Sequence, residues 1–194
     1  MNETRNRTVG CILIDEPTSG ENCLSGLSFP PGIAPHAFHR SAGERPLPAL
    51  QTLLQRVRRE YGTACVLAWG AGCMAALALA EQLPVERLAL VQPACEPVGT
   101  LFRPRRFTGF AMHNLALCVS DVLILEAGGG RVTRRIARGL RSSGWVALMP
   151  MPGKTGPDLY TNCENEVQRA LLAFLLGEEL PKNLAENCEM LYNH

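Results

Sequence analysis

An apolar run that ends in very small residues and continues as a helical pattern is the part of this sequence best suited to chemistry. Residues 64–69 are apolar, the small residues 70–72 follow, and an Ala/Leu-rich pattern then runs to residue 83. A strand, a tight turn and a helix in this order are typical of the nucleophile elbow, Gly-x-Ser-x-Gly, whose strained turn presents a serine above a sheet. In the frame 68–72, Gly70 stands where that serine should be.

Two other functional motifs, a thiol nucleophile and a dinucleotide-binding turn, match the same residues. A frame shifted by three residues makes Cys73 a thiol nucleophile, although no histidine base accompanies it and a buried packing role is the plainer interpretation. Residues 70–75 also match Gly-x-Gly-x-x-Ala, the dinucleotide fingerprint, but the next strand ends at Leu-Val-Gln-Pro (90–93), without the carboxylate that holds a ribose. As a further alternative, the glycines only relieve a tight turn.

Composition and charge favour an ordinary globular protein. The chain has 194 residues, of which 46% are hydrophobic and 19% charged, with a formal net charge of +1. We expect a single domain over 1–194, with peripheral tails at 1–8 and 181–194, and no nucleic-acid or membrane partner. The polar N-terminus does not resemble a secretion signal, so we expect a cytoplasmic protein whose eight cysteines are reduced thiols. The Cys and His spacings suggest no metal site, and we expect no cofactor.

Alternating strand and helix patterns predict the elements that position the small-residue turn. The expected strands are 9–14, 64–69, 87–92, 121–126 and 145–149, with a short extended piece at 33–34; the expected helices are 47–61, 71–83, 131–140 and one opened by the capping box Thr161-x-x-Glu164 and closed by Gly177. This alternation predicts an α/β fold, with a mainly parallel central sheet flanked by helices on both faces.

The order of these elements and several short motifs resemble the α/β-hydrolase fold from its third strand to its last helix. Residues 34–41 are similar to the family's Ala-Pro-Asp-x-x-Gly-His-Gly-x-Ser loop, and residues 75–87 resemble its elbow helix with a Pro-Glu-Arg-Val exit. Ala-Trp-x-x-Gly at 68–72 is weakly similar to esterases that act on pimeloyl thioester-linked methyl esters. The connection after residue 92 is short for this family, so the resemblance implies that its cap is absent or vestigial.

The resemblance also implies four functional positions, and each holds a residue that does not suit the role. Gly70 replaces the serine, Gly129 replaces the acid, and Lys154 occupies the turn that normally carries the histidine. The oxyanion-hole segment corresponds to residues 15–17, where Pro17 has no N–H to donate. Together these losses predict a pseudoenzyme with a degenerate triad and no catalytic residues.

The expected function is therefore non-catalytic binding of a small acyl-type or anionic ligand, or of a protein partner, through the vacated face. The expected binding residues are Asp15, Glu16, Trp69, Gly70, Ala71, Gly129, Arg131 and Lys154. The triple glycine 128–130 before Arg131 could form an anion nest near the basic cluster 103–106, or be a plain turn before a solvated arginine face. The alternatives are an active esterase, thioesterase or acyltransferase with a displaced nucleophile such as Cys73, and a dinucleotide-binding protein.

Overall fold

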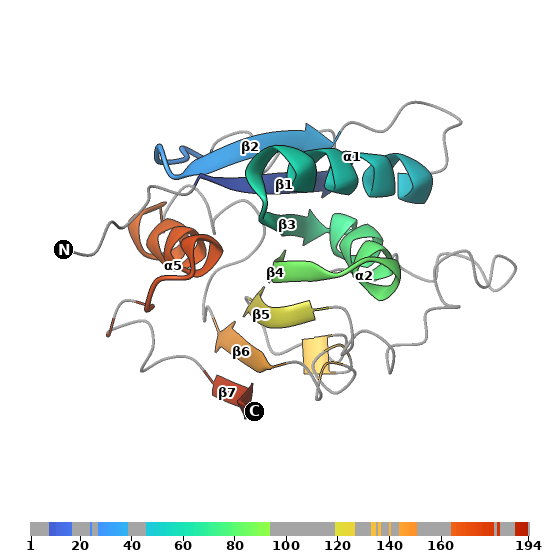
Figure 1. Ribbon diagram of the computed structural model, residues 1–194. Helices are drawn as coiled ribbons and strands as arrows, with labels where there is room; N and C mark the ends of the chain where they lie inside the picture. Colours follow the sequence, from blue (N-terminus) through green and yellow to red (C-terminus); the bar gives the residue numbers. More distant parts are fainter. Residues whose placement is uncertain are drawn as a thin grey trace, which may run out of the picture.

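The computed structural model describes residues 8–16, 24, 27–38, 46–93, 119–126, 133–134, 136, 140, 144–150, 164–180, 182 and 189–193 of the chain. Their helices and strands are β1 (Val9–Glu16), β2 (Ile33–Phe38), α1 (Pro46–Tyr61), β3 (Ala64–Gly70), α2 (Gly72–Gln82), β4 (Val85–Val91), β5 (Val119–Glu126), β6 (Trp145–Pro150), α5 (Glu164–Leu176) and β7 (Glu189–Asn193) (Figure 1). The strand order is β2-β1-β3-β4-β5-β6-β7. All neighbours pair in parallel except β6 and β7, which are antiparallel. The expected α/β fold with a mainly parallel sheet is confirmed.

Two strands differ from the sequence expectation. The short extended piece at 33–34 is the start of a full strand, β2, which continues to Phe38 through Pro35. Residues 189–193, placed in a peripheral tail, form β7 at the edge of the sheet. An edge strand needs hydrogen bonds on one side only, so it tolerates a proline such as Pro35 and polar neighbouring residues. These features made both strands difficult to recognise in the sequence.

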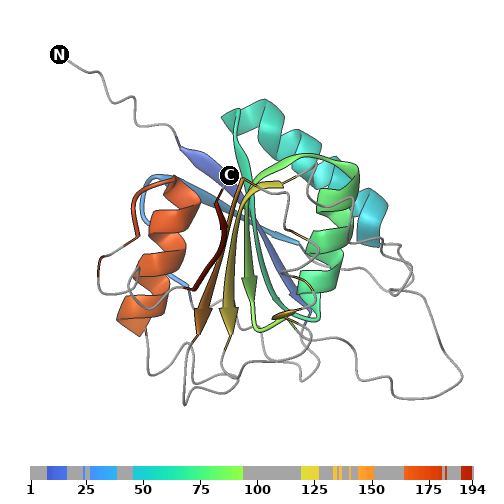
Figure 2. The ribbon, with the colours of Figure 1, turned by 90° about the horizontal axis from the view of Figure 1, so that it is seen from below.

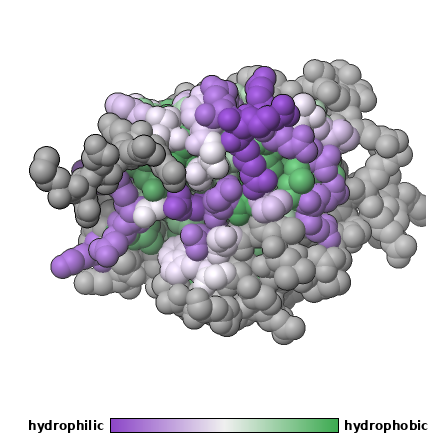
Figure 3. All heavy atoms as spheres, in the orientation of Figure 1, coloured by the Kyte–Doolittle hydropathy of each residue, from purple (hydrophilic) through white to green (hydrophobic). Residues whose placement is uncertain are grey.

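The two faces of the sheet carry different helices. On one face, Ile12, Ile14 and the inward residues of α1 and α2 form a continuous apolar cluster. On the other, Leu13 and Trp69 pack with the inward residues of α5. Figure 2 shows α5 on one side of the sheet and α1 with α2 on the other. In Figure 3, hydrophilic residues gather at the top of the view, over α1, whose exposed residues include Arg56, Arg59 and Glu60.

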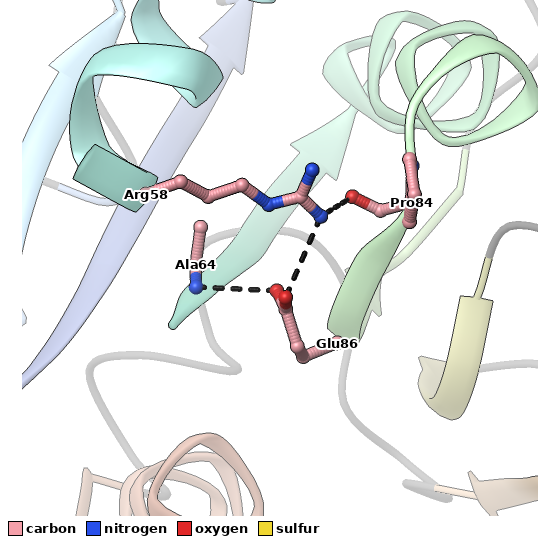
Figure 4. Close-up of polar contacts among 4 residues, drawn as sticks. All are labelled: Arg58, Ala64, Pro84 and Glu86. Atoms are coloured by element: carbon pink, nitrogen blue, oxygen red, sulfur yellow. Dashed lines mark hydrogen bonds and ion pairs between the residues drawn. The ribbon is translucent and has the colours of Figure 1, made fainter. Parts of the chain in front are cut away.

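At the amino-terminal edge of the sheet, a group of polar contacts joins α1 to two strands (Figure 4). The Arg58 guanidinium donates a hydrogen bond to the Pro84 carbonyl and lies 3.5 Å from Oε1 of Glu86. The other carboxylate oxygen of Glu86 accepts a hydrogen bond of 3.2 Å from the N–H of Ala64. The end of α1 and the starts of β3 and β4 are therefore tied together.

The last turn of α5 is held to the same edge on the opposite face. The Leu175 carbonyl accepts hydrogen bonds from the Arg87 guanidinium at 3.0 Å and from the Cys65 thiol at 3.6 Å. Phe174 stacks on Trp145 with ring centroids 5.7 Å apart. Gly177 ends the helix with φ 75°, and a Cβ there would overlap the Arg87 guanidinium. Arg87 thus supplies a partner to a carbonyl that a helix end leaves unpaired.

We predict that Arg87→Met lowers the free energy of unfolding by about 1–2 kcal/mol, because the Leu175 carbonyl loses its strongest donor. Urea denaturation measures the change. Arg59→Met, at an exposed position on α1, is the control and should change stability by less than about 0.5 kcal/mol. Equal effects of the two substitutions would show that Arg87 does not hold α5.

Candidate functional site

The order of the strands places a candidate site between β1 and β3. The chain passes from β1 outward to β2 and then returns to the other side of β1 with β3, from which β4, β5 and β6 follow in order. In open α/β sheets, ligands bind outside the carboxyl ends of the strands at such a switch point. The arrowheads of the parallel strands share one edge in Figure 2.

Five of the predicted site residues meet at this switch point. In the register of β1 and β3, Asp15 lies opposite Trp69, and Glu16 lies opposite Gly70. Ala71 follows directly and is the N-cap residue of α2. Because parallel strands in register end at the same level, residues 15–16 and 69–71 form one continuous segment of the carboxyl edge.

Gly70 makes the reversal that a strand-to-helix elbow requires. Its φ is 55°, a left-handed conformation that glycine adopts without steric cost. Apart from its two chain neighbours, no described residue has an atom within 4 Å of a Cβ built on Gly70. The next residue, Ala71, is the N-cap of α2 and makes no side-chain cap, so the first N–H groups of the helix have no partner of that kind.

Gly72 has a different role, set by packing. A Cβ on Gly72 would lie 2.5 Å from the carbonyl oxygen of Ile14, so only glycine lets α2 approach β1 this closely. In a dinucleotide fingerprint, the second glycine makes room for a pyrophosphate. Here strand β1 of the chain itself occupies that room, which accounts for Gly72 without a dinucleotide.

Cys73 is a core residue in this structure. Its side chain is completely buried, and its Sγ donates to the carbonyl oxygens of Ala68 at 3.3 Å and Val91 at 3.6 Å. Burial raises the pKa of the thiol well above its ordinary value. Since the thiolate is the nucleophilic form, this environment disfavours Cys73 as a displaced nucleophile.

Asp15 has a structural contact that the sequence does not predict. Its Oδ2 accepts a hydrogen bond of 3.0 Å from the N–H of Leu24, whereas its Oδ1 is buried and has no hydrogen-bond partner among the described residues. Leu24 is buried in the apolar cluster on the α5 face. The Gln168 amide also donates to the Ser28 carbonyl at 2.8 Å. Asp15 and α5 therefore fasten parts of the connection between β1 and β2 to the sheet.

The remaining predicted site residues cannot be placed. Gly129, Arg131 and Lys154 lie outside the described residues, as do the glycines 128–130 and the basic cluster 103–106. The backbone of Glu16 is described, but its side chain is not.

Two polar residues at this edge were missed by the sequence reasoning. The register places Trp69 opposite Val91, and Val91 opposite Leu125, so the residues after them, Gln92 and Glu126, continue the level of Gly70 along the edge. Glu126 is 9% exposed. The available signal was their position: each is the first polar residue after an apolar strand.

Neither a metal site, a membrane-spanning helix nor a sequence match adds to this picture in the described part of the chain. Within the described part of the chain, no three His, Cys, Asp or Glu residues are grouped so that they could hold a metal ion. None of the helices described here is long and apolar enough to cross a membrane. The sequence matches no protein-family model and no curated protein.

We predict that Cys73 is protected from thiol reagents in the native protein. Modification by 5,5′-dithiobis(2-nitrobenzoic acid), mapped by mass spectrometry, should be at least ~100-fold slower at Cys73 in buffer than in urea, because the residue must first be exposed by local opening. The same protein in urea is the control. Rapid stoichiometric labelling of Cys73 in the folded protein would contradict its burial and restore it as a nucleophile.

Proposed function

We propose that this chain is a non-catalytic, α/β-hydrolase-like protein that binds a small acyl-type or anionic ligand over the turn at residues 70–72. The observation that carries the proposal is the left-handed Gly70 at the β1/β3 switch point, where no described residue other than its two chain neighbours has an atom within 4 Å of a Cβ position. The turn has the backbone form of an elbow, but a glycine cannot attack a carbonyl. The turn can therefore hold a ligand but has no nucleophile to react with it.

The arrangement of the elements supports the hydrolase-like part of the proposal. The tight turn follows β3, beside the strand at which the order reverses, and the later parallel strands extend to one side only. Apolar clusters with helices lie on the two faces, α1 and α2 on one and α5 on the other. The fold alone does not determine activity, so the enzyme label does not follow from this likeness.

The ligand class follows from the donors and charges at the edge. In an elbow, the N–H after the nucleophile position faces the substrate oxygen, and here that N–H belongs to Ala71. The start of α2 adds partial positive charge, which favours an oxygen acceptor. The described strand ends carry the acidic residues Asp15, Glu16 and Glu126 and no Lys or Arg. An acyl carbonyl, with only partial charge, suits this edge better than a multiply charged anion; Arg131 and Lys154 would extend the range to anions if they face it.

The other candidate functions have less support. An esterase or acyltransferase using Cys73 would need a thiol that is accessible and readily ionised, and Cys73 is neither. A protein partner at the same edge remains the alternative occupant if small ligands fail to bind. The described cysteines Cys11, Cys65 and Cys73 are free thiols.

We predict that the protein has no serine-hydrolase activity and that Gly70→Ser does not create it. The substitution restores a hydroxyl at the elbow, but Gly129 and Lys154 supply no acid or base to activate it. Fluorophosphonate labelling and p-nitrophenyl butyrate turnover measure the outcome for both proteins.

The comparison of the two proteins separates the possible errors. Labelling of any serine in the wild type would overturn the pseudoenzyme proposal. Labelling of Gly70→Ser alone would show that an acid and a base are present and that only the serine is missing. Circular dichroism of the variant checks that it is folded, because a side chain at φ 55° is strained.

We also predict that an acyl ligand stabilises the fold, and that anion binding depends on the basic residues. A thermal-shift panel of butyrate, phosphate, butyryl-CoA and NAD tests the ligand class, since a ligand at a hundred times its Kd adds about 2.7 kcal/mol. Arg131→Ala and Lys154→Ala should reduce any shift caused by the anions, and Arg59→Ala on α1 should not. The account fails if nothing in the panel stabilises the wild type, and a saturable shift with NAD alone would favour the dinucleotide alternative.

A further inference from the structure

Gln92 holds an unusual backbone conformation directly after β4. Its φ is 46°, and it is the one non-glycine residue with a positive φ among the residues that the structure describes. Side chains with a Cβ rarely adopt this region, and Asn or Asp tolerate it better than Gln does. The N–H of Gln92 donates to the Leu125 carbonyl at 2.8 Å, so the neighbouring strand holds the conformation in place.

The position of Gln92 links this strain to the candidate site. Trp69 pairs with Val91 at the end of the β3/β4 register, and Gly70 and Gln92 are the residues that follow these two. Both left-handed residues therefore come directly after the same strand pair at the carboxyl edge, one position beyond the switch-point pair of Asp15 and Trp69. Gln92 is half-buried, so part of its side chain is accessible from solvent.

Strained residues of this kind cluster where proteins bind ligands, because a side chain is retained there at a cost to stability. Glycine would occupy φ 46° without strain, so the Gln92 side chain is unfavourable for folding at this position. The N–H groups at the start of α2 only donate, whereas the carboxylates at the strand ends only accept. The Gln92 carboxamide does both, and its natural complement is another amide.

We propose that Gln92 is a ligand-contacting residue of the site over residues 70–72 and that the ligand is an amide-linked acyl group. The amide carbonyl accepts from the first N–H groups of α2, and the amide group pairs with the Gln92 carboxamide. The uncharged amide also avoids repulsion from the Asp15 carboxylate at the end of β1. This inference rests on the proposed function and specifies its ligand class.

The binding test uses hexanamide and hexanoate, which share a chain and differ in the head group. Ligand-observed NMR titration should give tighter binding of hexanamide to the wild type. Gln92→Leu should weaken hexanamide binding at least ~10-fold, because the ligand amide loses its hydrogen-bond partner. Gln55→Leu, at an exposed position on α1, is the matched control and should bind as the wild type does.

The stability test uses Gln92→Gly. Relief of the left-handed strain should raise Tm by about 2–4 °C, while hexanamide binding is weakened as in Gln92→Leu. A fall in Tm would show that the side chain stabilises the fold and would overturn the inference. Unchanged hexanamide binding in both variants, or tighter binding of hexanoate by the wild type, would also overturn it while leaving the proposed function standing. A wild type that binds neither compound would contradict both.

Discussion

The contact between Gly72 and the Ile14 carbonyl is the constraint on which the candidate site depends. The absence of a Cβ lets the first turn of α2 lie directly against β1, although α2 follows β3. That approach fixes where the helix must begin, and the chain can reach it from β3 only through a sharp reversal. Gly70 makes the reversal in the left-handed region. The position of the open turn, the start of the helix and the level of the strand ends therefore follow from one close contact.

The polar contacts that tie the helices and the residues with left-handed backbones lie at opposite edges of the sheet. At the amino edge, Arg58 and Glu86 tie α1 to β3 and β4, and Arg87 holds the end of α5. At the carboxyl edge, Gly70 and Gln92 have left-handed backbones. A firmly tied edge can support strained residues at the opposite edge, because their cost is small relative to the packing of two apolar clusters.

Much of the fold could be predicted because its signals are local. Helix α1 repeats apolar residues at helical spacing and ends at Gly62, and β3 is a continuous apolar run, so both were expected nearly as they are. Strand β2 contains Pro35, and β7 has only five residues, so neither gives a clear pattern. Their existence depends on pairing with β1 and β6, which no local sequence pattern predicts.

The candidate site was predictable only where strand ends define it. Asp15, Trp69 and Gly70 meet because parallel register brings the ends of β1 and β3 to one level. The hydrogen bond from Leu24 to Asp15 and the left-handed φ of Gln92 depend on tertiary contacts that no local pattern encodes. The second glycine of the dinucleotide fingerprint, Gly72, also depends on packing: it lies so close to the Ile14 carbonyl oxygen that a Cβ would not fit, which the sequence alone does not reveal.

The most direct test of the account is amide chemical-shift mapping of the ¹⁵N-labelled protein during a titration with hexanamide, followed by prolonged incubation. The account predicts saturable shifts that are largest at residues 70–73, with the hexanamide recovered intact. Shifts confined to another part of the chain, or release of hexanoate that depends on the protein, would contradict a non-catalytic site over the turn at Gly70.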